Sequence, residues 1–482
     1  MPQNNGATGC VAVLDIGKTN VKLNVVTPAG DFLETVSRPN TVLAAPPWRH
    51  HDLGGLSEWV FTSLADLCRR HLITAFVTSG HGSGGVLVCG DPDDGDGAAL
   101  PMIDYEQALP DTIRDGYGPL SGSFSDRGSA LMLGATHQAR QLYWMQEAEP
   151  AAFAAARWYL GVPQYWAWRL SGVAVSEFTI LGAQSHLWNV AEARFTPIVA
   201  ARGWQRLMPP FARAYAPIGT IRAALAARYG IPQQIAVFPG IHDSSANFYR
   251  YQAAGLADAT VVSTGTWIVA LSTTTPLERL DERRSMTCNS DVDGRPVGGS
   301  LTMGGREFTA IAGSPAHEDA VTVETVGRLV ARGTFAIPTF GADDGIFAGT
   351  AGRGRIDGPP PADAGERKAL AVLYSALTTL ECLDALDAGG TVVLDGSFLR
   401  EPVYASLVAT LRPGADTRFS LESYGVASGA ALLFEHRTRT APASLPLGVA
   451  APLGALRDTL AAYAAQWRER SRANTDSGSR KG

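Results

Sequence analysis

Two short polar turns combine the residue types that bind phosphate groups in proteins. Residues 15–20 read DIGKTN and residues 263–266 read STGT, so each turn has one glycine among side chains that can donate hydrogen bonds. Glycine lets backbone N–H groups approach an anion closely, and the ammonium of Lys18 is a compact donor to phosphate. Such turns are also typical of ordinary surface hairpins, so their chemistry depends on the elements that hold them.

The segments around the two turns follow the same plan. The apolar run 11–14 and the alternating run 21–26 predict strands on either side of the first turn, and a third strand opens at Phe32. The second turn lies between the expected strands 259–263 and 267–272. Because about half of the chain separates the turns, we infer an internal duplication into two α/β domains. If these halves face each other, the paired turns can hold a polyphosphate.

A carboxylate next to an expected helix is a candidate for acid–base chemistry. Asp243 follows the break Pro239-Gly240 and precedes residues 244–248, which are typical of a helix start. An aspartate in this place is most often an N-cap. The alternative is a general base, fixed near a helix N-terminus at a domain boundary, that accepts a proton from an alcohol. Taken alone, the residues leave both interpretations open.

Two further acidic positions suggest metal binding. Asp15 ends the first strand and faces the first turn, where it would hold Mg²⁺ directly or through water, because magnesium takes few protein carboxylates. The alternative is a turn aspartate that bonds to its own backbone. The run His50-His51-Asp52 resembles a metal cluster, but neighbouring histidines point in different directions. This polar stretch fits a helix entry better, and we reject the metal interpretation there.

The composition restricts the classes of partner. The chain has 482 residues, a formal net charge of -6 and mixed charges, which argues against nucleic acid and anionic membranes as partners. No apolar run approaches the roughly 18 residues that cross a bilayer. Residues 1–5 lack the basic start of a signal peptide, so we expect a cytoplasmic protein. The five cysteines are widely spaced, which argues against a disulfide framework and a structural zinc site.

Several motifs, taken in their order along the chain, resemble one family. The turns 15–20 and 263–266 resemble the phosphate-binding motifs of the actin, sugar kinase and Hsp70 superfamily. Residues 239–246, PGIHDSSA, resemble the glycine-x-His-Asp signature of the FGGY carbohydrate kinases. Supporting matches are residues 77–82, 101–106, 165–172, 392–397 and 425–432. The resemblance implies an α/β fold of two ribonuclease H-like domains, of the actin/hexokinase superfamily, flanking a deep cleft.

The resemblance also divides the chain. It implies an N-terminal domain of residues 8–249 with the sugar pocket and the first phosphate loop, and a C-terminal domain of residues 250–470 that binds nucleotide. In the second domain, apolar residues at helical spacing predict a helix over 369–388 before a strand at 391–394. Residues 471–482 are small, polar and charged, which predicts a disordered tail.

Roles for individual residues follow from the resemblance. It implies an ATP-dependent sugar kinase that transfers the γ-phosphoryl group to an alcohol, uses ATP and Mg²⁺, and employs Asp243 as general base. The sugar would be bound by His81, Asp104, Tyr105 and His242. Nucleotide and phosphate would be bound by Asp15, Gly17, Lys18, Thr19, Asn20, Lys22, Thr264, Gly265, Thr266, Gly396 and Ser397, and Asp15 would also be the metal ligand. Strand alternation leaves the direction of Lys22 open.

Two departures from the family pattern bear on function. Lys18 stands where the family usually has threonine or serine, and Asp395 stands in place of one of two glycines in the adenosine loop. The motifs resemble the rhamnulose, fuculose and pentulose kinases more closely than the xylulose and glycerol kinases. The expected partners are a small sugar and ATP, and a homodimer is left open. The alternative function is a non-catalytic or regulatory protein of the same fold that binds sugar or nucleotide.

Overall fold

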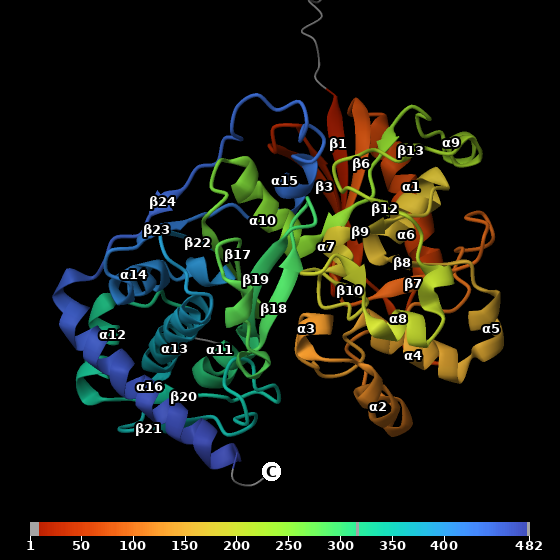
Figure 1. Cartoon of the computed structure of the whole chain (residues 1–482). Helices are drawn as coiled ribbons and strands as arrows, with labels where there is room; N and C mark the ends of the chain where they lie inside the picture. Colours follow the sequence, from red (N-terminus) through yellow and green to blue (C-terminus); the bar gives the residue numbers. More distant parts are fainter. Residues whose placement is uncertain (1–8, 315–317, 480–482) are drawn as a thin grey trace, which may run out of the picture. The chain divides into compact units, whose positions relative to one another are not determined.

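The computed structural model describes residues 9–314 and 318–479, and the chain divides into two units (Figure 1). Unit 1 holds the described residues up to Leu256 together with Cys288–Pro296 and Tyr424–Ser444. Unit 2 holds Ala257–Thr287, Val297–Ser423 and the described residues from Leu445 onward. The structure contains two seven-stranded sheets, of which the first lies in unit 1 and the second is formed mainly by residues of unit 2.

The sheet of unit 1 is built around a hairpin. Strand β1 (Cys10–Ile16) pairs antiparallel with β2 (Asn20–Val26), which pairs antiparallel with β3 (Phe32–Pro39). On its other side β1 pairs in parallel with β6 (Ile73–Gly80). The strands expected around the first turn are therefore present, and β6 joins them from outside the hairpin.

Further elements complete unit 1 on both sides of this sheet. Beyond β6 the sheet continues with β14 (Ala236–Val237), β13 (Gly219–Thr220) and β15 (Ile241–His242). The helices that pack against it are α1 (Leu53–Cys68), α6 (Val162–Ser171), α10 (Asp243–Ala253) and α15 (Gly425–Ala431). The remaining helices are α2 (Asp111–Tyr117), α3 (Phe124–Arg127), α4 (Gln138–Ala148), α5 (Pro150–Ala155), α7 (Phe178–Leu181), α8 (Pro197–Ala201) and α9 (Ala223–Tyr229). Small sheets are formed by β4 (Val42–Leu43), β5 (His50–His51), β7 (Gly85–Val88), β8 (Trp158–Gly161), β9 (Ser176–Glu177), β10 (Trp188–Asn189), β11 (Arg194–Phe195) and β12 (Phe211–Ala212).

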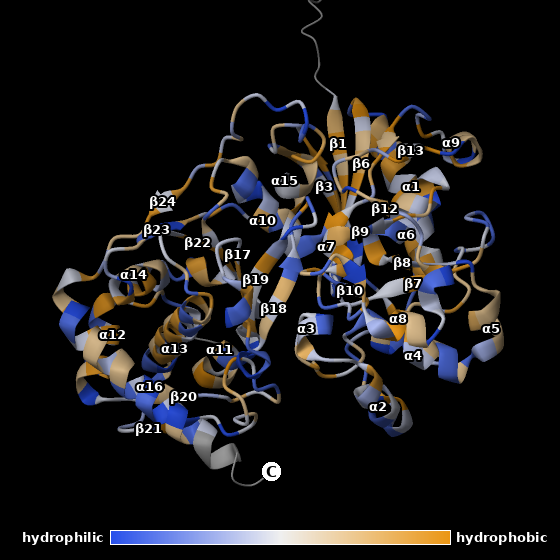
Figure 2. Cartoon of the chain, viewed as in Figure 1, coloured by the Kyte–Doolittle hydropathy of each residue, from blue (hydrophilic) through white to orange (hydrophobic). Residues whose placement is uncertain are grey.

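Alternate residues of β1 face two different hydrophobic layers. Leu14 belongs to the core that includes α1 and α6, whereas Val13 belongs to the core that includes α10 and α15. Successive side chains of a strand point to opposite faces, so an apolar run such as β1 can be buried on both. Figure 2 shows this apolar character in the orange colour of β1 and β6. The sequence thus fixes β1 as a central strand with helices on both sides.

Unit 2 repeats this arrangement. Strand β16 (Thr260–Thr264) pairs antiparallel with β17 (Trp267–Ser272) and in parallel with β22 (Thr391–Gly396). The sheet is completed by β18 (Met286–Ser290), β19 (Pro296–Met303), β23 (Asp416–Phe419) and β24 (Gly448–Val449). Because β16, β17 and β22 are related as β1, β2 and β6 are, the topology agrees with the predicted duplication.

One core joins the helices of unit 2 to its sheet. The central helix is α13 (Ala364–Ala385), most of whose residues are buried. Around it lie α11 (Gly305–Ala312), α12 (Val323–Arg332), α14 (Pro402–Leu411) and α16 (Arg457–Ser479), and a separate small sheet pairs β20 (Phe335–Ile337) with β21 (Arg355–Asp357). Trp467 of α16 is buried in this core, and its indole N–H donates to the Ala336 carbonyl at 2.7 Å.

The chain after residue 470 differs from the prediction. The composition of residues 471–482 predicts disorder, but α16 continues to Ser479, and residues 480–482 lie outside the described residues. Asn474 is buried and donates from Nδ2 to the Pro338 carbonyl at 2.6 Å. Ser471, also buried, bonds back to the Trp467 carbonyl at 2.8 Å. The tertiary contact of Asn474, which composition does not reveal, and the local bond of Ser471 hold polar residues in the helix.

The division between units is also less simple than a single boundary. The expected boundary between residues 249 and 250 falls inside α10, and unit 1 takes in α15 from late in the chain. Ser428 of α15 donates from its hydroxyl to the Gly30 carbonyl at 2.7 Å, and the rings of Phe32 and Tyr424 stack with centroids 3.8 Å apart. Contacts with β3 and its preceding turn therefore attach this late segment to unit 1.

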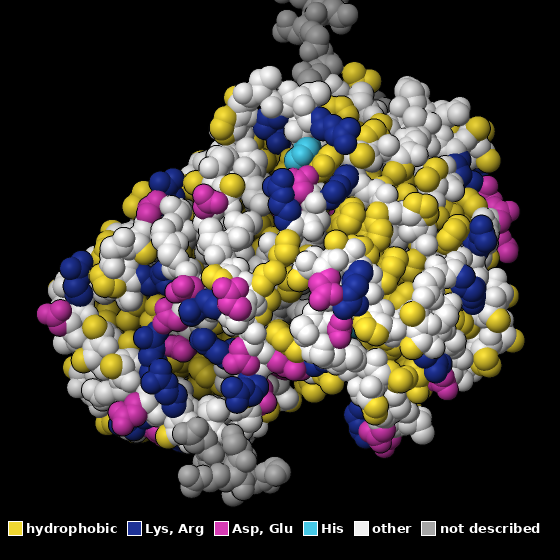
Figure 3. Space-filling view, in the orientation of Figure 1, with side chains coloured by type: hydrophobic (Ala, Val, Ile, Leu, Met, Phe, Trp, Pro, Cys, Tyr) yellow, Lys and Arg dark blue, Asp and Glu magenta, His cyan; other side chains and the backbone are white. Residues whose placement is uncertain are grey.

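In the part of the chain that the structure describes, each helix is too short or too polar to span a bilayer. On the face shown in Figure 3, acidic and basic side chains lie side by side over α13 and α16.

The close packing of α15 on α10 leads to a stability prediction. A Cβ at Gly429 would lie 1.9 Å from the Ala246 carbonyl oxygen, so the two helices approach each other backbone to backbone. We expect Gly429→Ala to lower the free energy of unfolding by about 1–3 kcal/mol, the usual cost of overpacking. Gly54→Ala in α1 is the control, because nothing lies within 4 Å of its Cβ position. Urea unfolding followed by circular dichroism measures both, and equal stabilities of the two variants would contradict the packing argument.

Candidate functional site

The parallel strands of unit 1 bring three of the predicted chain segments to one edge of the sheet. In the pairing of β1 with β6, Asp15 lies beside Ser79. In the pairing of β15 with β6, His242 lies beside Gly80. Asp15, His81 and Asp243 therefore lie at or just beyond the carboxyl ends of three neighbouring parallel strands. This edge is where open α/β sheets place their ligands.

The first turn connects this edge to a second group of residues. The Gly17 N–H donates to the Asn20 carbonyl at 3.1 Å, and Asn40 donates to the Gly17 carbonyl at 2.8 Å. Thr19 and Asn20 are exposed at the tip of the turn. The ammonium of Lys18 forms an ion pair with Asp104 and lies 5.1 Å from the centre of the Tyr105 ring. Lys18 thus joins the predicted phosphate loop to the predicted sugar pocket.

Asp104 lies fully buried between cations. Besides Lys18, Arg49 approaches it, with Nη2 2.8 Å from Oδ2. Burial alone would raise the pKa of Asp104, but the hydrogen bond and charge of Lys18 outweigh it and lower that pKa. Among the described residues Oδ2 has no well-aligned hydrogen-bond donor, although it forms the ion pair with Arg49. The carboxylate is held in its charged form, and Oδ2 can still accept a hydrogen bond besides this ion pair.

His81 is the polar centre of this group. It is buried, and in the described chain neither ring nitrogen has a hydrogen-bonding partner. Its ring lies 4.8 Å from that of Tyr105 and 6.3 Å from that of His51, whose buried Nε2 is also unpartnered. Burial, reinforced by the neighbouring His51, lowers the pKa of His81 to about 3, and burial lowers that of His51 to about 4. Both rings are therefore neutral near pH 7 and can each donate and accept a hydrogen bond.

Asp243 is the first residue of α10. His242 occupies the N-cap position, so the N-cap alternative does not describe Asp243. Its Oδ1 accepts from the Ser244 N–H at 2.5 Å and lies 3.2 Å from Nε2 of His242. The side chain is about one third exposed, at 34%. The helix N-terminus favours its negative charge, and its exposure leaves it open to a ligand.

Asp15 is electrostatically linked to Asp243. Burial and, to a smaller extent, the charge of Asp243 together raise the pKa of Asp15 to about 7, against the opposing charge of Lys22 on β2. Lys22 pairs with Asp15 in the strand register, and its side chain is exposed. A divalent cation would stabilise the charged form of a buried carboxylate such as Asp15, whose ionisation the charge of Asp243 disfavours. The residues present therefore fit Mg²⁺.

The second predicted turn, residues 263–266, lies in unit 2 and is held by hydrogen bonds to nearby backbone atoms. The Thr264 hydroxyl donates to the Asp395 carbonyl at 2.7 Å and accepts from the Phe398 N–H at 3.2 Å. The Gly265 N–H donates to the Trp267 carbonyl at 2.9 Å, whereas Thr266 is exposed. These contacts commit the Thr264 side chain to the backbone and leave Thr266 open to solvent.

The predicted adenosine loop adjoins this turn. Gly396 has a φ of 97°, and a Cβ there would lie 2.0 Å from the Thr264 carbonyl oxygen, so only glycine fits. The Ser397 hydroxyl is 3.4 Å from the same oxygen. All predicted residues of unit 2 therefore lie together at the ends of β16 and β22.

Two residues of the unit 1 group were not among the predicted ones. Arg49 was missed, since an isolated arginine carries no motif, and His51 was considered only for a metal cluster. Asp52, next to His51, caps α1 by accepting from the Gly55 N–H at 2.9 Å, as the helix-entry interpretation expected. Both residues lie just before α1, and His50 between them forms a β-bridge with Ile103, the neighbour of Asp104. Their position before the helix is the signal that could have found them.

Comparisons with known proteins point to one family. Residues 120–248 match the model of the N-terminal domain of the FGGY family of carbohydrate kinases. Residues 256–442 match the model of the C-terminal domain of carbohydrate kinase FGGY. The L-fuculokinase of Escherichia coli strain K12 is 26% identical over 297 residues, which cover 58% of this chain and 60% of that protein. The match thus spans about 60% of the length of this curated relative.

Solved structures resemble the chain over almost its whole length. A carbohydrate kinase from Novosphingobium aromaticivorans superposes with a TM-score of 0.85 at 30% identity, covering 97% of this chain and 99% of that one. A ligand-bound xylulose kinase from Lactobacillus acidophilus superposes with a TM-score of 0.80 at 16% identity, covering 98% and 100%. This likeness confirms the predicted α/β fold of the actin/hexokinase type.

The neutral, buried state of His81 leads to a pH prediction. In the unfolded chain a histidine binds a proton below about pH 6.5, whereas folded His81 resists it down to about pH 3. The free energy of unfolding therefore falls as the pH drops below about 6.5, and His81 alone contributes a loss of about 2 kcal/mol by pH 5. When the pH is lowered from 8 to 5, we expect the free energy of unfolding of His81→Gln to fall by about 2 kcal/mol less than that of the wild type. Urea unfolding at both pH values measures this, and identical losses would show that His81 is protonated in the folded chain.

Proposed function

Because this chain belongs to the FGGY family of carbohydrate kinases, we propose that it transfers the γ-phosphoryl group of ATP to a hydroxyl of a ketose or polyol. The observation that carries the proposal is the set of buried polar atoms without partners around His81 and Asp104, close to the carboxylate of Asp243. Buried polar atoms are normally hydrogen-bonded. A ligand with several hydroxyl groups can donate hydrogen bonds to the unpaired acceptor atoms and accept them from the unpaired donor atoms.

The sugar pocket is proposed to lie within unit 1. The Oδ2 of Asp104, besides its ion pair with Arg49, accepts from a sugar hydroxyl, and the neutral ring of His81 both accepts and donates. Tyr105, whose ring lies beside His81, and His242 complete the pocket. The binding of a neutral sugar fits a site whose histidines are uncharged and whose aspartate is already paired with cations.

Asp243 is proposed to act as the general base. Its partly exposed carboxylate accepts the proton of the sugar hydroxyl while that oxygen forms a bond to the γ-phosphorus and the bond to the β–γ bridging oxygen breaks, releasing ADP. The hydrogen bond from the Ser244 N–H and the nearby His242 hold the carboxylate in place. An oriented base of this kind accelerates the transfer without a covalent intermediate.

Phosphate and metal are proposed to bind at the two turns. In unit 1, Gly17, Thr19 and Asn20 offer donors, with Lys18 beside them, and in unit 2 the exposed Thr266 and the neighbouring backbone do so. Lys22 acts through its charge on Asp15. Asp15 would hold Mg²⁺, which when bound offsets the negative charge of the phosphoryl oxygens. Gly396 and Ser397 are proposed to lie against the nucleotide.

The relatives suggest which sugars to test first. The curated relatives are L-fuculokinases at 26% identity, which agrees with the resemblance to rhamnulose, fuculose and pentulose kinases. We therefore propose a ketose of this group as substrate and place L-fuculose first in a substrate panel. The domain roles follow, with sugar in unit 1 and nucleotide in unit 2.

Replacing the proposed base tests the reaction. We expect Asp243→Asn to bind ATP as the wild type does but to lose sugar-dependent ADP release by a factor of about 10² or more, the usual effect of removing a positioned base. The assay measures ADP release with ketoses and polyols, and nucleotide binding is measured by calorimetry. Asp258→Asn, which removes an exposed carboxylate shortly after α10, is the control. Unchanged turnover would contradict the role of Asp243, and absence of sugar-dependent ADP release in the wild type would favour a non-catalytic binding protein.

Replacing the pocket aspartate tests sugar binding separately. We expect Asp104→Asn to raise the KM for the sugar about 10-fold or more, because hydrogen bonds to a charged group are lost, while the KM for ATP changes little. Glu106→Gln is the matched control, since this half-exposed carboxylate lies 3.8 Å from the same Lys18 ammonium. Equal sugar KM values for the two variants would show that Asp104 acts only as the partner of Lys18.

A further inference from the structure

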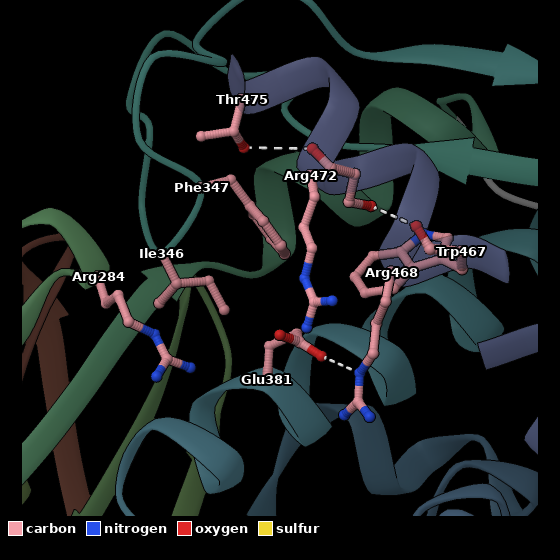
Figure 4. A pocket seen from close by; sticks show the side chains of 9 residues that line it. Arg284, Ile346, Phe347, Glu381, Trp467, Arg468, Arg472 and Thr475 are labelled. Atoms are coloured by element: carbon pink, nitrogen blue, oxygen red, sulfur yellow. Dashed lines mark hydrogen bonds and ion pairs between the residues drawn. The ribbon is translucent and has the colours of Figure 1, made fainter. Parts of the chain in front are cut away.

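A cavity in unit 2 is lined by three arginines that the proposed reaction does not use. It has a volume of about 250 Å³ and lies between α16, α13 and the segment that carries Ile346 and Phe347 (Figure 4). Its basic residues are Arg284, Arg468 and Arg472. None of the residues of the turn 264–266 or of the loop 395–398 lines this cavity, so it is separate from the proposed nucleotide contacts of the same unit.

The spacing of residues on α16 builds one wall of the cavity. Arg468, Ser471, Arg472 and Thr475 follow the helical spacing of three and four residues, so they share a face. Two arginines four residues apart repel each other and destabilise a helix unless an anion lies near them. Trp467, Ile346 and Phe347 are buried and give the cavity apolar walls.

Among the side chains that the structure describes, one of the three arginines of the cavity is paired with carboxylates. The Arg468 Nε lies 2.5 Å from Oε1 of Glu381, and the same guanidinium also pairs with Asp384. Within the described part of the chain, the guanidinium groups of Arg284 and Arg472 have neither an ion pair nor a hydrogen bond. Figure 4 shows these two groups projecting into the space from different walls, with Ile346 and Phe347 between them. Two positive charges therefore face the cavity after Glu381 has been neutralised.

The neutral polar groups of the cavity, in contrast, already have partners. The Ser471 hydroxyl donates to the Trp467 carbonyl at 2.8 Å, and the Thr475 hydroxyl donates to the Ser471 carbonyl at 3.2 Å. The Trp467 indole N–H donates to the Ala336 carbonyl. A neutral sugar would find few free groups here, whereas an anion would meet two free guanidinium groups, whose planar N–H pairs match phosphate and carboxylate.

We propose that this cavity binds a small dianion, held between Arg284 and Arg472. The volume suits a compact metabolite that carries a phosphate or two carboxylates, and the apolar walls pack against its carbon skeleton. Such a ligand links α16 to the segment around Arg284 and to that around Phe347, which stabilises the folded unit 2. This site is distinct from the sugar pocket, so the inference does not depend on the kinase reaction.

Thermal unfolding of the full chain tests the proposal, with inorganic phosphate as probe and KCl used to hold the ionic strength constant. A ligand that binds only the folded chain raises the Tm with a saturating dependence on its concentration. We expect such a rise with phosphate, and a smaller one or none with the monovalent anion acetate. In Arg284→Gln/Arg472→Gln we expect the apparent Kd for phosphate to increase at least about 10-fold, since two charge-assisted contacts are removed.

Matched controls separate this site from the phosphate turns. Arg367→Gln/Arg457→Gln removes the same charge from exposed positions of unit 2 outside the cavity, and we expect it to bind phosphate as the wild type does. If the Arg284/Arg472 variant does not fold by circular dichroism, the single Arg472→Gln variant, at an exposed position, takes its place. Equal phosphate responses of the wild type and the cavity variant, no saturating response of the wild type, or an equal response to acetate would each overturn the proposal.

Discussion

The parallel pairing of β6 with β1 on one side and β15 on the other is the constraint on which the candidate site of unit 1 depends. The register sets Asp15 beside Ser79 and His242 beside Gly80, so the segments that follow these strands leave the sheet at one edge. A shift of one residue would exchange the two faces of β1. The cores on both faces, which bury Leu14 and Val13 separately, hold the register against such a shift.

This edge collects charges and polar groups that do not fully satisfy one another. Burial and the charge of Asp243 disfavour the ionisation of Asp15, and Asp104 is buried against Lys18 and Arg49. The ring of His81 is buried without a hydrogen-bonding partner among the described residues. Unsatisfied polar groups cost folding free energy, and natural proteins accept such a cost at sites that a ligand completes.

What could be predicted from the sequence was local. The strands around Gly17 and Gly265 follow from short apolar runs and turn glycines, and the repeated turn indicated the related sheets. The structure brings the predicted residues of each unit together, because strand ends and the turns beside them follow from the order of the elements. The resemblance supplied the roles, which remain proposals.

What could not be predicted depends on contacts between distant segments. The ion pair of Arg49 with Asp104 joins two loops that carry no pattern of their own. The attachment of α15 to unit 1 depends on its packing against α10 and on the Ser428 bond to Gly30, and neither contact has a periodic signal in the sequence. The same holds for the end of α16, whose Asn474 is buried against the Pro338 carbonyl. The composition of such a segment gives only its average polarity, whereas individual contacts determine whether the segment is folded.

The two related turns have diverged in how they use their side chains. In unit 1, Lys18 extends from the turn to Asp104, so the turn shares its charge with the group around His81. In unit 2, the Thr264 hydroxyl is bonded to the Asp395 carbonyl and the Phe398 N–H, so the side chain fixes the loop at the end of β22. The backbones differ too, because the Gly17 N–H donates to the carbonyl of Asn20, three residues on, and the Gly265 N–H donates to that of Trp267, two residues on. The two hairpins therefore share their strand pairing, whereas the length of the turn and the contacts of its side chains have diverged.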